Sequence, residues 1–259
     1  MKGAFFLRNP PDADRNFLII CDHASNHIPA EFEGLGLSAE KLQSHIAYDI
    51  GAAEVADKIA AFLHCPLIMS SFSRLLIDPN RGLDDPTLIM ELSDGTSILG
   101  NVGLDDVALQ SRVERFYAPY HAALAKLIET ALGDDFVPII LSVHSFTPIW
   151  RELARPWQAS VLWDKDARLK DIMVDYMASQ TDYVFGDNTP YSGRLKNDTL
   201  YRHGTQNGLP HALIELRQDE IANDAGQSVW AKHLVAILQQ AIKHSDLRHR
   251  KFFGSHCDS

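Results

Sequence analysis

Phe17-Leu-Ile-Ile-Cys-Asp-His-Ala-Ser-Asn-His-Ile-Pro29 is the stretch that decides the fold. It begins with an apolar run, which is typical of a buried strand, and then changes to metal-binding side chains and a proline. In open α/β sheets, ligands bind at the carboxyl ends of the strands. We therefore interpret the stretch as a strand that carries His23 to a binding site at the rim of a sheet. Taken alone, it fits an ordinary polar loop equally well.

A second stretch has the same organisation. The apolar run 136–143 is typical of a central parallel strand, and His144 and Pro148 follow it. Two strand ends that each carry a histidine and a proline-bearing loop are harder to explain by coincidence than one. They indicate that His23 and His144 converge at one edge of the sheet.

Apolar patterns typical of strands and of helices alternate along the chain. Strands are predicted from Phe17 onward and over 66–71, 136–143, 158–163 and 210–217, and helices over 54–63, 106–132, 166–179 and 225–244, with a kink at Pro119. This alternation is typical of a mostly parallel central sheet with helices on both faces. We expect an α/β fold of this kind, with one domain over residues 1–259 and partial disorder in the polar tail 245–259.

Charge and composition argue against several classes of partner. The 259 residues carry a net charge of -10, whereas nucleic-acid binding needs clustered Lys and Arg. No apolar run is long enough to span a bilayer, and the three cysteines form no paired framework. We expect a cytoplasmic protein with a small-molecule ligand and without nucleic-acid or membrane partners. The sequence does not predict its oligomeric state.

Asp49 completes a candidate metal site. It precedes the apolar pattern of the helix 54–63, so we expect it near a helix start, where a carboxylate is favoured. Two neutral imidazoles and a carboxylate suit a catalytic Zn²⁺, which takes three protein ligands and keeps a fourth position open. The candidate ligands are therefore His23, Asp49 and His144. For Asp49 considered alone, a helix cap is the simpler explanation.

Charged residues near apolar segments supply further candidates for amide hydrolysis. Glu215 lies on a predicted strand, where an acid is costly unless it is paired, hydrogen-bonded or near a metal. We interpret it as a general base or proton shuttle, with pairing to Arg217 as the alternative. Arg74 is the candidate for stabilising an oxyanion, with a surface salt-bridge network as the alternative. The candidates for holding substrate carboxylates are Asn80, Arg81 and Arg202.

Five motifs in this order resemble the N-formylglutamate amidohydrolase family from about residue 17 to residue 238. They are CDHASNHIP (21–29), HIAYDIGA (45–52), SRLLIDPNR (73–81), SVHSFTP (142–148) and LIELRQD (213–219). The resemblance implies a zinc-dependent, exopeptidase-like α/β fold. It also implies hydrolysis of N-formyl-L-glutamate to formate and glutamate, a late step of histidine breakdown.

The wider superfamily suggests roles for individual residues. The segment 74–81 resembles one in aspartoacylases, in which the first arginine assists the carbonyl and an Asn-Arg pair binds the substrate carboxylate. Those positions are here Arg74, Asn80 and Arg81, and Glu215 matches the base of that group.

The same comparison bears on the third metal ligand. The zinc carboxypeptidase pattern would have a glutamate where this chain has Asn26, which is a poor zinc ligand. The resemblance to zinc-dependent cell-wall amidases instead implies an acidic ligand at the following helix start. We therefore predict His23, Asp49 and His144, with Asn26 as a weaker fourth contact.

Three functions are compatible with these observations. The first is hydrolysis of N-formylglutamate by a metal-dependent amidohydrolase. The second is the same chemistry on another N-acyl amino acid or a small peptide, because HASN in the first motif departs from the shorter HSG form associated with the histidine pathway. The third is a non-catalytic protein that binds acidic amino acids.

Overall fold

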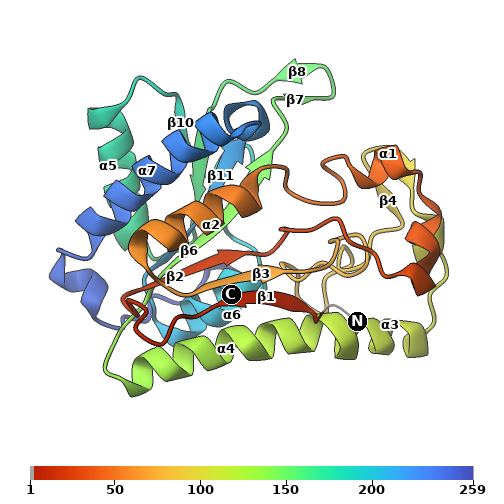
Figure 1. The fold of residues 1–259 in the computed structure, drawn as a ribbon, viewed down its shortest axis with the longest axis horizontal. Helices are drawn as coiled ribbons and strands as arrows, with labels where there is room; N and C mark the ends of the chain where they lie inside the picture. The colour runs from red at the N-terminus through yellow and green to blue at the C-terminus, as the bar shows by residue number, and fades with distance from the viewer. Residues whose placement is uncertain (1–2, 259) are drawn as a thin grey trace.

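A seven-stranded sheet forms the centre of the computed structural model, which describes residues 3–258 (Figure 1). Its strand order is β1-β3-β2-β6-β11-β9-β10. The strands are β1 (Phe5–Arg8), β2 (Phe17–Cys21), β3 (Leu67–Ser70), β6 (Ile139–Phe146), β9 (Ala159–Leu162), β10 (Phe185–Asp187) and β11 (His211–Arg217). β3, β2, β6 and β11 run parallel, whereas β1 pairs antiparallel with β3 and β9 pairs antiparallel with β11. The predicted mostly parallel sheet is confirmed.

Helices cover both faces of this sheet, as predicted. Figure 1 shows α2 (Ala52–Leu63), α5 (Arg168–Gln180) and α7 (Asp224–Ala241) on one face, and α4 (Ala118–Gly133) with α6 (Thr199–His203) on the other. The alternation of side chains along β2 explains the two layers, because Ile19 packs into the core beneath α2 and α7 while Ile20 packs against α4. Both side chains are fully buried.

Smaller elements extend from the sheet. They are α1 (Ala39–Leu42), α3 (Asp106–Arg112) and two hairpins, β4 (Leu92–Ser93) with β5 (Thr96–Ser97) and β7 (Ile149–Trp150) with β8 (Leu153–Ala154). The predicted long helix is divided into α3, a π-helical turn over Val113–Tyr117 and α4. Pro119 lies in the first turn of α4, where its missing N–H costs little.

The tail has a defined path up to residue 258, in contrast to the expected partial disorder. Short 3-10 turns cover Ser245–Arg248 and His256–Asp258, and the side chain of Ser255 is buried. The backbone N–H of Lys251 donates to the Gly208 carbonyl at 2.8 Å. Among the helices of residues 3–258, none combines the length and the apolar character needed to cross a membrane.

The turn that precedes α2 fixes the position of Asp49. Gly51 is the N-cap of α2 and has a φ of 82°, a left-handed conformation that favours glycine. A Cβ at this position would lie 2.6 Å from the Ile221 carbonyl oxygen. Because a glycine caps the helix, the alternative interpretation of Asp49 as the cap is wrong, and its carboxylate points elsewhere.

We predict that Gly51→Ala destabilises the protein by about 1–3 kcal/mol, because it adds backbone strain and an overlap with Ile221. Gly95→Ala is the matched control, since Gly95 also has a positive φ (72°) but its Cβ would meet no atom of the described residues within 4 Å. Urea unfolding should show a clearly smaller loss for the control, about 1 kcal/mol. Equal losses would contradict the role given to the contact with Ile221.

Candidate active site

Four adjacent parallel strands deliver the candidate residues to one edge of the sheet. His23 lies two residues beyond β2, and the segment 71–81 follows β3. His144 on β6 and Glu215 on β11 are direct partners in the strand pairing, so they lie side by side. β6 runs on to Phe146, so His144 lies inside the strand and not just beyond it as the sequence suggested.

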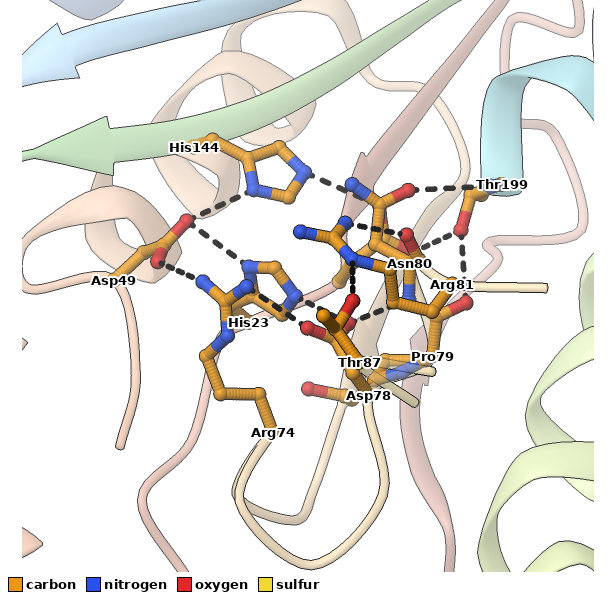
Figure 2. A network of polar contacts seen from close by, with 12 residues as sticks. His23, Asp49, Arg74, Asp78, Pro79, Asn80, Arg81, Thr87, His144 and Thr199 are labelled. Atoms are coloured by element: carbon orange, nitrogen blue, oxygen red, sulfur yellow. Dashed lines mark hydrogen bonds and ion pairs between the residues drawn. The ribbon is translucent and has the colours of Figure 1, made fainter. Parts of the chain in front are cut away.

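His23, Asp49 and His144 form a compact buried cluster (Figure 2). The Oδ2 atom of Asp49 lies 2.8 Å from Nδ1 of His144 and 3.4 Å from Nδ1 of His23. The ligand atoms that the three residues offer all lie within 4.8 Å of one another. Two imidazole nitrogens and a carboxylate oxygen that converge in this way can hold a divalent metal ion, and they are the donors that Zn²⁺ accepts.

A second carboxylate contacts the far side of each imidazole. Nε2 of His23 lies 2.7 Å from Oδ1 of Asp78, and Nε2 of His144 lies 3.2 Å from Oδ2 of Asp22. An ionised carboxylate can only accept, so each Nε2 donates to its second carboxylate, and each Nδ1 faces Asp49, where a bound cation would take the place of a proton. Such partners fix the tautomer and orientation of metal-binding histidines. Sequence analysis missed this role for Asp22 and Asp78, although both lie within the quoted motifs.

The electrostatics of the cluster favour replacing a proton by a cation. Burial opposes the charged form of His144, but hydrogen bonds to Asp22 and Asp49 outweigh it and raise its pKa to about 10. Burial likewise opposes ionisation of Asp22, yet the hydrogen bond from His144 lowers its pKa to about 2. The two histidines also hold the pKa of Asp49 far below its usual range, against the effect of burial. A divalent cation among these carboxylates would release the proton of His144.

Glu215 has the properties of a poised acid or base. Its side chain lies at the cavity wall and is 8% exposed. Burial raises its pKa to about 7, although the charge of His144 acts in the opposite direction. Its Oε2 atom has no hydrogen-bond partner among the described residues. A carboxyl group with this pKa can both accept and return a proton near neutral pH.

Arg74 lies across the cluster from these groups, and Figure 2 shows its guanidinium next to His23 and Asp49. It donates to Asp78 at 2.8 Å and approaches Oδ1 of Asp49 at 3.6 Å. Burial disfavours its charge, but Asp78 and Asp49 raise its pKa above the ordinary arginine value. The guanidinium therefore stays charged and has a fixed direction, as electrostatic stabilisation of a transition state requires.

Asn80 and Arg81 line the same cavity, whereas two other predicted residues do not. Arg202 donates to the hydroxyl of Tyr117, lies over that ring at 5.3 Å and is not among the cavity-lining residues of the described chain. The amide of Asn26 donates to the Leu42 carbonyl at 2.8 Å, and Asn26 is not among the cavity-lining residues of the described chain. The expectations that Arg202 meets substrate and that Asn26 is a fourth ligand are therefore not supported by this geometry.

The cavity itself has a volume of about 370 Å³. It is lined by His23, Asp49, Arg74, Asn80, Arg81, His144 and Glu215, and also by residues that sequence analysis did not single out, among them Trp150, Tyr191 and Asp198. Asp198 is the N-cap of α6, and burial raises its pKa to about 7. These additional residues come from a hairpin and loops that carry no chemical motif, so the sequence offered no signal for them.

Comparison with known proteins agrees with this geometry. The sequence model of a family described as N-formylglutamate amidohydrolase matches residues 15–222. A crystal structure of a gene product from Agrobacterium tumefaciens is 32% identical, with a TM-score of 0.88 over 93% of this chain and 95% of that one. N-formylglutamate amidohydrolase from Ralstonia eutropha JMP134 has the same fold at 22% identity, with a TM-score of 0.69 over 93% and 98% of the two chains. A comparison with curated proteins gave no match.

We predict that Asp78→Asn weakens Zn²⁺ binding by about 10–100-fold, because His23 loses the carboxylate that orients it. Calorimetric titration of the metal-free protein with Zn²⁺ measures this change. Asp12→Asn is the matched control, since Asp12 contacts His64 at 3.0 Å on the surface. An unchanged affinity in Asp78→Asn would show that this carboxylate does not support the site.

Proposed function

The chain belongs to the N-formylglutamate amidohydrolase family, and we propose that it hydrolyses the amide bond of a small anionic N-acyl amino acid in a metal-dependent reaction. The leading substrate is N-formyl-L-glutamate, which gives formate and L-glutamate. Hydrolysis of amide bonds follows from the family. The observation that carries the proposal is the convergence of His23, Asp49 and His144 with Glu215 and Arg74 in one cavity.

In this proposal His23, Asp49 and His144 hold one Zn²⁺. These residues fit Zn²⁺ because they offer two imidazole nitrogens and a carboxylate oxygen, and because a second carboxylate orients each imidazole. When bound, Zn²⁺ supplies a Lewis acid that polarises the amide carbonyl and makes water more acidic. The three side chains are 2–4% exposed, so the electrostatic interactions among them are only weakly screened by water.

Glu215 is the proposed proton shuttle. It takes a proton from the attacking water as the carbon–oxygen bond forms, and it gives that proton to the amide nitrogen as the carbon–nitrogen bond breaks. The products are a carboxylic acid and an amine, so atoms and charge balance without another reactant. The pKa of about 7 suits both transfers.

Arg74, Asn80 and Arg81 are the proposed substrate contacts. Arg74 stabilises the negative charge that develops on the carbonyl oxygen, since Asp78 already fixes its direction. Asn80 and Arg81 hold the carboxylate of the amino acid, as a bidentate guanidinium can. Arg81 is partly restrained by its contacts with Thr87 and the Asn80 carbonyl, at 3.0 and 2.9 Å.

The cellular context is also a proposal. A role in histidine breakdown would follow from N-formylglutamate as substrate. A cytoplasmic location is supported by the free cysteines Cys21, Cys65 and Cys257, which suit a reducing compartment.

We predict that the zinc-loaded protein releases formate from N-formyl-L-glutamate and that His144→Ala abolishes this release, because a metal ligand is lost. Chelation should abolish it and added Zn²⁺ should restore it. Formate is measured with a coupled dehydrogenase assay, with Asp12→Asn as the control. Full activity in the chelated protein or in His144→Ala would exclude the metal mechanism, and inert protein that still binds glutamate would indicate a binding function.

We predict that kcat/KM for N-formyl-L-glutamate falls as the pH drops below about 7. Glu215 must be ionised to accept a proton, and its pKa is raised to about 7, so the active form is lost on acidification through that value. Glu215→Gln should lower kcat by about 10²–10⁴-fold while keeping its zinc content. A profile that is flat from pH 5 to 8, or an active Glu215→Gln, would rule out the shuttle.

A further inference from the structure

One wall of the cavity is aromatic, and the reaction described above does not use it. The wall consists of Trp150 from the β7–β8 hairpin, Tyr191 from the loop after β10, and His45 from the segment before Asp49. The rings of His45 and Trp150 meet edge to face with centroids 6.2 Å apart. Burial lowers the pKa of His45, although its Nε2 atom lies 3.3 Å from Oδ2 of Asp94, which acts in the opposite direction.

Arg155 holds this wall in place. Its guanidinium lies 5.4 Å from the Trp150 ring and 5.2 Å from the Tyr191 ring, and it donates to the Tyr191 hydroxyl at 3.0 Å. Its backbone N–H donates to the Pro148 carbonyl at 2.9 Å, which closes the base of the hairpin. Arg155 is 8% exposed and Tyr191 is 44% exposed, so the buried guanidinium backs a ring that faces partly toward solvent. The aromatic wall is therefore a preformed surface and not a set of loose side chains.

The aromatic wall and the proposed carboxylate site line the same cavity. Arg155, Glu215 and Arg74 are among the charges that act on Tyr191, so the wall adjoins the catalytic groups. Arg81 and His144 both act on Asp198, the N-cap of α6, so this side of the cavity adjoins the catalytic groups as well. With Asn80 and Arg81 assigned to the amino-acid carboxylate, the wall is the part of the cavity lining that is left for the acyl group of the substrate.

A formyl group would leave this wall without a contact. It has a single carbon and cannot cover an indole and a phenol ring. The whole cavity, which also has to hold the amino-acid part of the substrate, has a volume of about 370 Å³, within the range that accommodates drug-sized ligands. Planar apolar groups gain from stacking on aromatic rings in addition to the burial of their area.

We propose that Trp150 and Tyr191 form an acyl-group subsite, and that the protein prefers N-acyl amino acids whose acyl group is larger than formyl and carries a planar apolar part over N-formyl-L-glutamate. This inference rests on the proposed amide hydrolysis and specifies its substrate class. The acyl group stacks against Trp150, while the amino-acid carboxylate contacts Asn80 and Arg81. Trp150 sets specificity and takes no part in proton transfer.

The test compares N-benzoyl-L-glutamate with N-formyl-L-glutamate on the zinc-loaded protein. We expect kcat/KM to be at least tenfold higher for the benzoyl compound, and Trp150→Ala to reduce the benzoyl-to-formyl ratio at least tenfold. Trp150→Phe should restore most of the ratio. Leu153→Ala is the matched control, because Leu153 pairs with Trp150 in the hairpin but is 73% exposed and lies outside the cavity lining of the described residues.

Binding is measured separately, by calorimetry on Glu215→Gln protein, in which turnover of the ligands is strongly slowed. We expect tighter binding of N-benzoyl-L-glutamate than of N-formyl-L-glutamate, and loss of this difference when Trp150→Ala is added. Formyl hydrolysis without a benzoyl preference in rate or binding would overturn the subsite and leave the proposed function standing. Trp150-dependent binding without hydrolysis of either compound would support the subsite and overturn the function.

Discussion

The burial of several carboxylates at one edge of the sheet is the constraint on which the rest of the structure depends. Asp22, Asp49 and Asp78 are 0–4% exposed, and an unpaired charge at such a depth would be strongly destabilising. Two imidazoles and the guanidinium of Arg74 pair with them. Each carboxylate contributes to this network of ion pairs. Removing one of its partners would therefore leave a charged group unpaired in the buried, low-dielectric interior. The network therefore fixes its own geometry.

Much of the fold and of the site centre was predictable, because both depend on local patterns. The apolar runs at 17–21 and 136–143 identify buried strands, and parallel strands end at a common edge. A histidine after one strand and a histidine late in another must then approach each other. The family motifs added the order of these segments. The pattern did not predict the exact end of a strand, because pairing with the adjacent strands of the sheet extends β6 beyond His144.

The expectations for Arg202, for Asn26 and for the tail 245–259 differ from the structure for one reason. Each depended on the direction and the contacts of side chains, which the sequence does not show. Arg202 lies in α6, a helix of five residues, and the short helix turns its guanidinium toward Tyr117. Asn26 lies in an irregular segment, and its amide satisfies the Leu42 carbonyl. The tail appeared too polar to order, yet Gly208 and Asp164 supply backbone and carboxylate partners for it. Such contacts join residues that are distant in sequence, and composition carries no information about them.

The groups proposed for amide hydrolysis and the groups proposed for substrate specificity come from different parts of the fold. His23, Arg74, His144 and Glu215 come from four hydrogen-bonded strands and the segments that directly follow them, and Asp49 comes from the turn before α2, so the hydrolytic groups are held by the sheet and by a packed helix. Trp150 and Tyr191 come from a hairpin and a loop that meet through Arg155. Loops tolerate substitution far better than a packed sheet does. A change in these segments can therefore alter the acyl group that is accepted while the hydrolytic groups stay in place, and the amide-cleaving machinery of the family does not by itself fix the substrate.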